Sequence, residues 1–152
     1  MSNKPADVTE STIPAAGRVP AETSLACRLR PRQLRRGSSA LAGELELENT
    51  SSSVLEIEVS TSLLQYLNLV VTDAAGNVVS DSYYGDIFAP LEKPYTLRLE
   101  PGKTFTGPVS LMGNVCKERQ QPGEYTVQAV YEYYGLKAFS EPLRVRLSAK
   151  DR

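Results

Sequence analysis

The chain has 152 residues, a formal net charge of -1, and 41% hydrophobic and 23% charged residues, which is the composition of one globular domain. It has two cysteines and no histidine, which excludes Ser-His-Asp and Cys-His nucleophiles, HExxH zinc sites and four-ligand Cys/His zinc sites. The slightly acidic balance argues against a nucleic-acid partner, and no apolar run approaches the about 18 residues of a membrane helix.

Residues 1–22 are rich in Pro, Ala, Ser and Thr and show no hydrophobic period. A segment of this composition buries too little apolar surface to fold, so we predict a flexible N-terminal tail. A solvated leader is the simpler interpretation, and a partner-binding segment is the alternative. The segment also lacks the apolar core of a signal peptide, which predicts a cytoplasmic location. A leader removed beforehand would leave the same pattern.

Hydrophobic alternation with a period of two begins near residue 24 and defines one domain over residues 23–149. Leu25, Cys27 and Leu29 alternate with arginines, and in GELELENTSSS and VLEIEVS aliphatic residues alternate with five glutamates on either side of an N-T-S turn. Such alternation predicts strands with one buried and one charged face.

Arginines cluster on and after the first expected strand, at positions 28, 30, 32, 35 and 36. Those at 28, 30 and 32 share one face of a strand, which suits an acidic partner or a phosphate chain. The glutamates of the next strands are close in sequence, so cross-strand ion pairs are the favoured interpretation.

The middle of the chain holds a predicted hairpin and the longest irregular connection. In LLQYLNLVVTDAAGNVVSD the loop DAAGN joins an apolar strand to a return strand beginning at Val78. The following segment, residues 80–94, has no period and carries the first candidate site, an interaction loop containing Tyr83, Tyr84, Asp86 and Phe88. Tyrosine gives large contact area at low entropic cost. The alternative is that these aromatic residues close one end of the sandwich.

Regular alternation resumes in YTLRLEPGKTFTGPVSL, which predicts two strands joined by the Pro101-Gly102 turn, with Tyr95 facing inward on the first. Pro108 indicates a bulge or an edge strand. MGNVCKERQQ is predicted to be a polar loop, and LRVRL near the C-terminus to be the last strand.

Four tyrosines follow in QPGEYTVQAVYEYY. Tyr125, Tyr131 and Tyr133 have the same parity, so we expect them to face the opposite sheet. Tyr134 has the opposite parity at the expected tip of the last hairpin, and it completes the list of candidate interaction residues.

Gly123, Tyr125 and Val127 form the G-x-Y-x-V pattern of the tyrosine corner in immunoglobulin-like sandwiches, without the cysteine and tryptophan of antibody domains. About eight strands at regular spacing favour the same class, an all-β antiparallel sandwich. The order ELENTSSSVLEIEV, VVTDAAGNVVSDS, LRLEPGKTFTGPVSL and QPGEYTVQAVY resembles the BsuPI-type intracellular proteinase inhibitors and a wider set of bacterial immunoglobulin-like modules, over roughly residues 41–147. The resemblance implies the fold and suggests protease inhibition through an exposed loop.

Loop carboxylates are the remaining candidates for chemistry. Asp73, Asp81 and Asp86 lie in or beside turns, where aspartates commonly accept hydrogen bonds from their own backbone. We therefore expect no enzyme, no metal site and no cofactor. We also expect Cys27 and Cys116 to be free thiols, because cytosolic disulfides are rare; a disulfide between them is the alternative.

The favoured function is a non-catalytic module that binds another protein through end loops or a sheet edge. A protease inhibitor and a small-ligand or carbohydrate-binding sandwich are the alternatives. Neither the identity of the partner nor the oligomeric state follows from the sequence.

Overall fold

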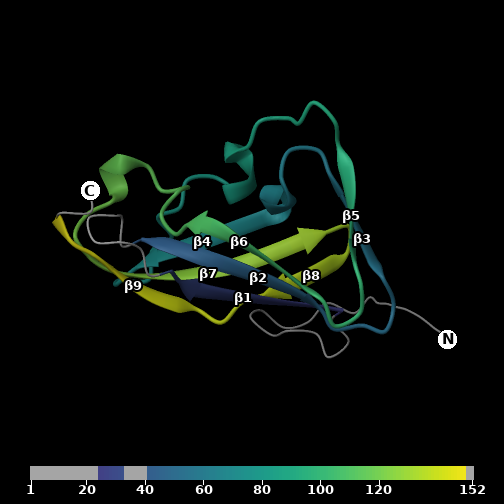
Figure 1. The fold of residues 1–152 in the computed structure, drawn as a ribbon. Helices are drawn as coiled ribbons and strands as arrows, with labels where there is room; N and C mark the ends of the chain where they lie inside the picture. Colours follow the sequence, from purple (N-terminus) through teal and green to yellow (C-terminus); the bar gives the residue numbers. More distant parts are fainter. Residues whose placement is uncertain (1–23, 33–40, 150–152) are drawn as a thin grey trace.

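In the computed structural model, residues 24–32 and 41–149 are described, and they form nine antiparallel strands and three short 3₁₀ helices (Figure 1). The strands are β1 (Leu25–Pro31), β2 (Ala42–Asn49), β3 (Leu55–Val59), β4 (Leu67–Asp73), β5 (Tyr95–Leu99), β6 (Thr104–Ser110), β7 (Gly123–Tyr133), β8 (Leu136–Phe139) and β9 (Leu143–Leu147). The 3₁₀ helices are η1 (Leu63–Tyr66), η2 (Tyr84–Ile87) and η3 (Lys117–Arg119). The predicted tail and the arginines at 35 and 36 lie outside the described residues.

Two sheets form an all-β sandwich, as the sequence predicted. One has the order β1-β2-β6, and the other has β4 beside β7, with β8 and β9 along the far edge of β7. Strand β1 packs against β7, β8 and β9 of the other sheet. This order matches the A-B-E and C-F-G sheets of immunoglobulin-like domains, with β7 as strand F.

The core consists of the inward-facing residues that alternation singles out. Leu25, Leu45 and Leu47 are fully buried on the first sheet, and Leu69 and Val127 are fully buried on the second. Burying a side chain of this size contributes about 1.5–3 kcal/mol relative to leaving it exposed. The hydrophobic pattern of the sequence therefore accounts for the pairing of the two layers.

The tyrosine corner is present at the start of β7. The Tyr125 hydroxyl donates to the carbonyl of Gln121 at 2.5 Å and accepts from the Gln121 N–H at 3.0 Å. Tyr125 is also buried. The ring thus ties β7 to the connection that precedes it, as in other immunoglobulin-like sandwiches.

The arginines of β1 pair with the glutamates of β2. Arg28 lies 3.1 Å from Glu46 and 2.7 Å from Glu48, and Arg30 also contacts Glu46. The antiparallel register places these side chains opposite one another. The cross-strand interpretation is therefore correct for Arg28 and Arg30.

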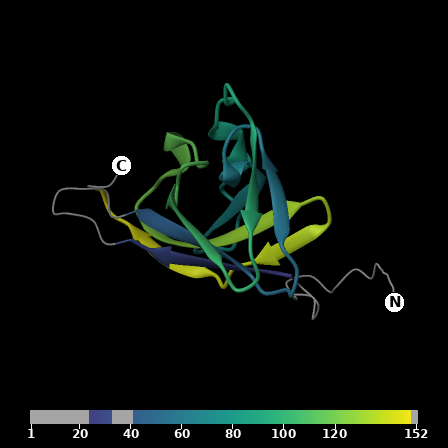
Figure 2. The same cartoon turned by 45° about the vertical axis from the view of Figure 1, so that its right-hand side comes forward.

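Strands β3 and β5 form a two-stranded arm that runs steeply across the direction of the long strands (Figures 1 and 2). The arm continues the β2–β6 pair beyond a corner at Asn49, because Glu48 pairs with Thr104 before the corner and Leu55 pairs with Leu99 after it. The fully buried Asn49 amide donates to the carbonyls of Ser53 and Leu99, each at 2.8 Å. One asparagine thus satisfies the backbone where the ribbon bends.

Three sequence-based expectations are wrong. The return segment of the hairpin is shorter than a strand: Val78 forms an isolated bridge with Thr72, and the Val79 N–H donates to β4 at 2.8 Å, but no strand follows. The segment 112–121 is not simply a polar loop, since Met112, Asn114 and Val115 are buried in it. Tyr95 is 50% exposed, because β5 belongs to the arm and not to the main sheets of the sandwich.

Candidate functional site: a tyrosine-lined groove

The β7–β8 hairpin presents an exposed tyrosine in an unusual backbone conformation. Tyr134 has φ 41° and Gly135 has φ 88°, and Tyr134 is 85% exposed. Two residues with positive φ at a two-residue hairpin loop are typical of a type I′ turn, where Asn, Asp and Gly are preferred. An exposed tyrosine in the left-handed region is uncommon and carries a conformational cost. The side chain contributes little to the core in return.

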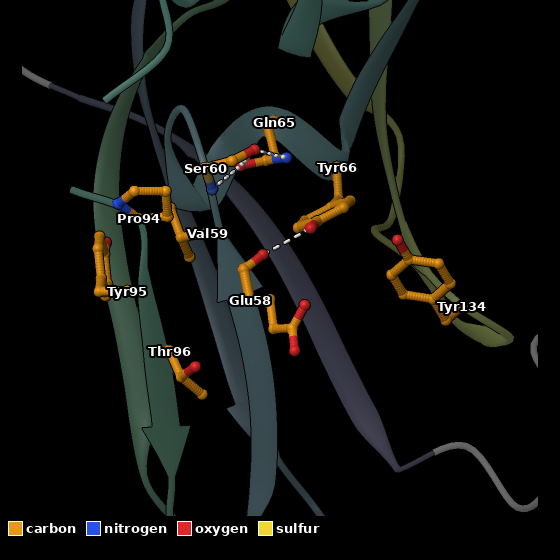
Figure 3. Close-up of a pocket in the computed structure, with 9 residues that line it drawn as sticks. All are labelled: Glu58, Val59, Ser60, Gln65, Tyr66, Pro94, Tyr95, Thr96 and Tyr134. Carbon is orange, nitrogen blue, oxygen red and sulfur yellow. Dashed lines mark hydrogen bonds between the residues drawn. The ribbon is translucent and has the colours of Figure 1, made fainter. Parts of the chain in front are cut away.

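Tyr134 lies on one side of a groove of about 350 Å³ between the hairpin tip and the arm (Figure 3). The other side is formed by β3, β5 and the segments next to them, and η1 lies at one end. The groove is lined by Glu58, Val59, Ser60, Gln65, Tyr66, Pro94, Tyr95, Thr96 and Tyr134. Its walls thus combine three aromatic rings with polar side chains, a mixture typical of recognition surfaces.

Two tyrosine hydroxyls attach the arm to the rest of the sandwich. The Tyr133 hydroxyl accepts from the backbone N–H of Glu58 at 3.0 Å, and the Tyr66 hydroxyl donates to the Glu58 carbonyl at 2.5 Å. The Tyr66 and Tyr133 rings pack edge-on, with 4.7 Å between their centroids. Burial is the main cause that raises the pKa of Tyr66, so this hydroxyl remains a donor at neutral pH. The floor of the groove is therefore fixed by a network and not by a flexible loop.

A carboxylate without an ion pair faces the groove. Among the described strand residues, every other glutamate lies within 4.0 Å of an arginine or lysine. Glu58 has no such partner, because the register places Thr96 opposite it, whereas Glu56 is opposite Arg98. Figure 3 shows the Glu58 side chain extending from β3 toward the side on which Tyr134 lies.

The predicted interaction loop is only partly available for recognition. Tyr83 is 64% exposed and Asp86 is exposed, but Phe88 is half-buried and Tyr84 is buried. The Tyr84 hydroxyl accepts from the Ser110 N–H at 2.9 Å, and its ring meets Phe88 edge-on. For Tyr84 and Phe88 the structure therefore agrees with the alternative, in which the loop aromatics pack against the sandwich.

Two contacts hold the first half of the same loop against its surroundings. The Asn114 amide donates to the Ser82 carbonyl at 2.7 Å. A Cβ at Gly85 would lie 2.1 Å from the Gln65 carbonyl oxygen, so only glycine allows this close approach between η2 and η1. The part of the segment around η2 is accordingly a folded connection.

A second cavity, of about 320 Å³, lies between Tyr84 and β6. Strand β6 is an edge strand, as Pro108 predicted. Pro108 has no N–H to offer, and the Ser110 N–H is satisfied by Tyr84. Tyr84 and Pro108 thus protect this edge against pairing with another strand.

Of the five predicted interaction residues, only Tyr134 lines the groove. Tyr66, Tyr95 and Glu58 were not predicted as site residues. Tyr66 lies in a 3₁₀ turn without a two-residue period, and Tyr95 was expected to face inward. The uneven pairing of the glutamates in β3 was the available signal, but it becomes visible only once the strand register is known.

The cysteines and aspartates are the remaining side chains with chemical potential. The described cysteines are free thiols, with Cys27 buried and Cys116 exposed. The Asp81 carboxylate accepts from the Cys116 N–H at 2.6 Å, which is the first cause that lowers the pKa of Asp81. No cluster of three or more metal-ligating side chains occurs within residues 24–32 and 41–149. In the same ranges, no helix is long and apolar enough to cross a membrane.

No protein-family model matches the sequence, and no curated protein is significantly similar to it.

Proposed function

We propose that this protein is a non-catalytic immunoglobulin-like module that binds another protein through the tyrosine-lined groove. The observation that supports this most directly is the conformation of Tyr134 at the rim of the groove. This residue is 85% exposed, although its backbone has φ 41°. Backbone strain at an exposed position points to selection for something other than stability.

The aromatic content of the groove fits a protein ligand. Tyrosine presents a large, rigid contact area with a polar hydroxyl, and it is enriched where proteins bind other proteins. Tyr95 and Tyr134 are exposed on opposite sides of the groove, at 50% and 85%. The arm behind them is held by the Tyr66 and Tyr133 hydrogen bonds, so little ordering entropy is lost on binding.

A carbohydrate ligand is the second candidate, and the same groove supports it. Tyrosine rings beside Gln65 and Thr96 supply both a stacking surface and hydrogen-bonding groups. Protease inhibition, which the resemblance to the BsuPI-type inhibitors suggests, remains a proposal without a specific observation in its favour. The folded Ser82–Pro90 segment would be its reactive loop.

The test is a pull-down with three immobilised proteins, which are wild type, Tyr134→Asn and Tyr83→Asn. Asparagine tolerates positive φ, so Tyr134→Asn removes the ring without disturbing the turn. Tyr83→Asn is the matched control, because Tyr83 is also an exposed tyrosine but lies outside the groove. A protein retained in stoichiometric amount by wild type and Tyr83→Asn, and lost with Tyr134→Asn, is the expected result.

Three outcomes would contradict the proposal. A partner retained equally by Tyr134→Asn would place the interface elsewhere. Saturable quenching of tyrosine fluorescence by an oligosaccharide, abolished in Tyr134→Asn, would support the carbohydrate candidate instead. Near-stoichiometric inhibition of a protease, lost on cleavage of the Ser82–Pro90 segment, would support the inhibitor.

A further inference from the structure

We propose that the groove receives an arginine side chain of the partner protein, with Glu58 as its counter-ion and the tyrosine rings as its aromatic walls. This inference rests on the proposed function and assigns a chemical class to the group that is bound. It follows from the side chains that line the groove and from the Glu58 carboxylate, which the β3–β5 register leaves without an ion pair among the described residues.

The described lining of the groove is negatively charged. Glu58 is exposed and is the only strand glutamate without a cation within 4.0 Å among the described residues. Among the residues that the structure describes, no arginine or lysine lines the groove. The groove therefore carries a net negative charge, which favours a cationic ligand and disfavours an anionic one.

The aromatic lining of the groove suits a guanidinium group. Tyrosine faces attract a cation through the ring quadrupole, and arginine is found in this arrangement more often than lysine. A guanidinium is planar and can stack on a ring while it donates two parallel hydrogen bonds to a carboxylate. Glu58 and the rings of Tyr66 and Tyr134 line one groove and supply both kinds of contact.

Glu58 lies at a fixed position of β3. Its backbone N–H and carbonyl are held by Tyr133 and Tyr66, so the outer edge of the strand beneath the carboxylate is anchored. Within residues 24–32 and 41–149, the Glu58 side chain has no ion-pair or hydrogen-bond partner. A carboxylate presented on a fixed backbone loses little freedom when it pairs, which increases the net gain from a charged ligand.

The experiment titrates the full-length protein with two short peptides, acetyl-Gly-Arg-Gly-amide and the same peptide with citrulline in place of arginine. Citrulline has nearly the shape of arginine but no charge. Binding is followed by the amide NMR shifts of Glu58, Thr96 and Tyr134. We expect the arginine peptide to shift these resonances saturably, to bind more weakly as salt is added, and to bind at least about tenfold more tightly than the citrulline peptide.

Two matched variants separate Glu58 from its neighbours. Glu58→Gln keeps the size of the side chain and the backbone hydrogen bonds but removes the charge, and we expect it to weaken binding of the arginine peptide about tenfold. Glu56→Gln, two residues away on the same face of β3, removes a carboxylate already paired with Arg98 and is expected to leave binding unchanged. Amide spectra of both variants report directly on whether the fold is retained.

Equal affinity for the arginine and citrulline peptides, or equal losses in Glu58→Gln and Glu56→Gln, would overturn the assignment. The two proposals fail separately. If Tyr134→Asn loses the protein partner while the arginine peptide does not bind wild type, the arginine site is wrong and the protein-binding function stands. If the arginine peptide binds through Glu58 but no protein partner depends on Tyr134, the arginine site stands and the proposed function is wrong.

Discussion

The Tyr133 hydroxyl accepts a hydrogen bond at 3.0 Å from the backbone N–H of Glu58, 75 residues earlier in the chain. Tyr66 completes the arrangement by donating to the Glu58 carbonyl. The backbone N–H and carbonyl of Glu58 lie on the outer edge of β3. Two side chains thus provide the hydrogen-bond partners that a neighbouring strand would otherwise provide. The arm is consequently held against the sandwich although no strand of the main sheets pairs with it.

Tyr133→Phe should loosen the arm without unfolding the domain. The change leaves the Glu58 N–H without its partner, at a cost of about 1 kcal/mol in the free energy of unfolding. Urea denaturation measures this cost, and hydrogen exchange at the Glu58 amide should become faster because the opening of the arm is local. Tyr83→Phe is the control, and unchanged exchange at Glu58 in Tyr133→Phe would show that the hydroxyl does not hold the arm.

Tyr125→Phe should destabilise the whole domain by about 1 kcal/mol, the usual value for a lost buried hydrogen bond. The ring stays in the core, so the effect isolates the hydroxyl and its bonds to Gln121. Equilibrium unfolding in urea measures this difference in the free energy of unfolding, and we expect the same m-value for both proteins. A variant as stable as wild type would remove the energetic role of the tyrosine corner.

Tyr134→Asn should leave the stability within about 1 kcal/mol of wild type, because relief of strain and loss of the ring contact with Tyr133 oppose each other. The two rings lie 4.7 Å apart, but Tyr134 is 85% exposed, so the contact is a weak one. Thermal unfolding of the two proteins side by side measures the balance. A much larger loss would show that Tyr134 has a structural role and would weaken its assignment to recognition.

Alternation in the sequence was enough to predict the two sheets and most of their inward faces. Leu25, Leu47 and Val127 are buried as predicted, because only the apolar face of an alternating strand can pack against a facing sheet. Tyr125 was predictable for a different reason, because its motif is local. These features depend on residues close together in the chain.

The groove could not be predicted in this way. Its position depends on the bend at Asn49, where a side chain takes over backbone hydrogen bonds, and no hydrophobic period reports such a bend. The same bend removes β5 from the main sheets, so the inward parity of Tyr95 has no facing sheet to meet. The meeting of Glu58, Tyr66 and Tyr134 is a long-range consequence of this geometry.

The two cysteines should differ sharply in reactivity. Burial raises the pKa of the Cys27 thiol to about 12, and Cys27 is only 6% exposed. Cys116 is exposed, although its hydrogen bond with Asp81 raises its pKa as well. We expect a thiol reagent to modify one cysteine per folded chain at mildly alkaline pH and both in denaturant. Loss of the native reaction in Cys116→Ser is the control, and rapid modification of both thiols in the folded protein would contradict the burial of Cys27.

Asp73 should make stability depend on pH in the acid range. Its carboxylate accepts from the N–H groups of Asn77 at 2.9 Å and Ala75 at 3.0 Å, and the bond from Asn77 is the main cause that lowers its pKa below 3.8. A carboxyl group whose pKa is lower in the folded state stabilises the fold above its unfolded pKa, and this contribution is lost as the pH falls through the folded pKa. Asp73→Asn should therefore have a lower melting temperature than wild type at neutral pH, and the two proteins should converge at pH values well below 3.8. Asp86→Asn is the control, because the Asp86 carboxylate has no hydrogen-bond partner among the described residues. If the difference in melting temperature between Asp73→Asn and wild type persisted in acid, the effect would come from packing and not from charge.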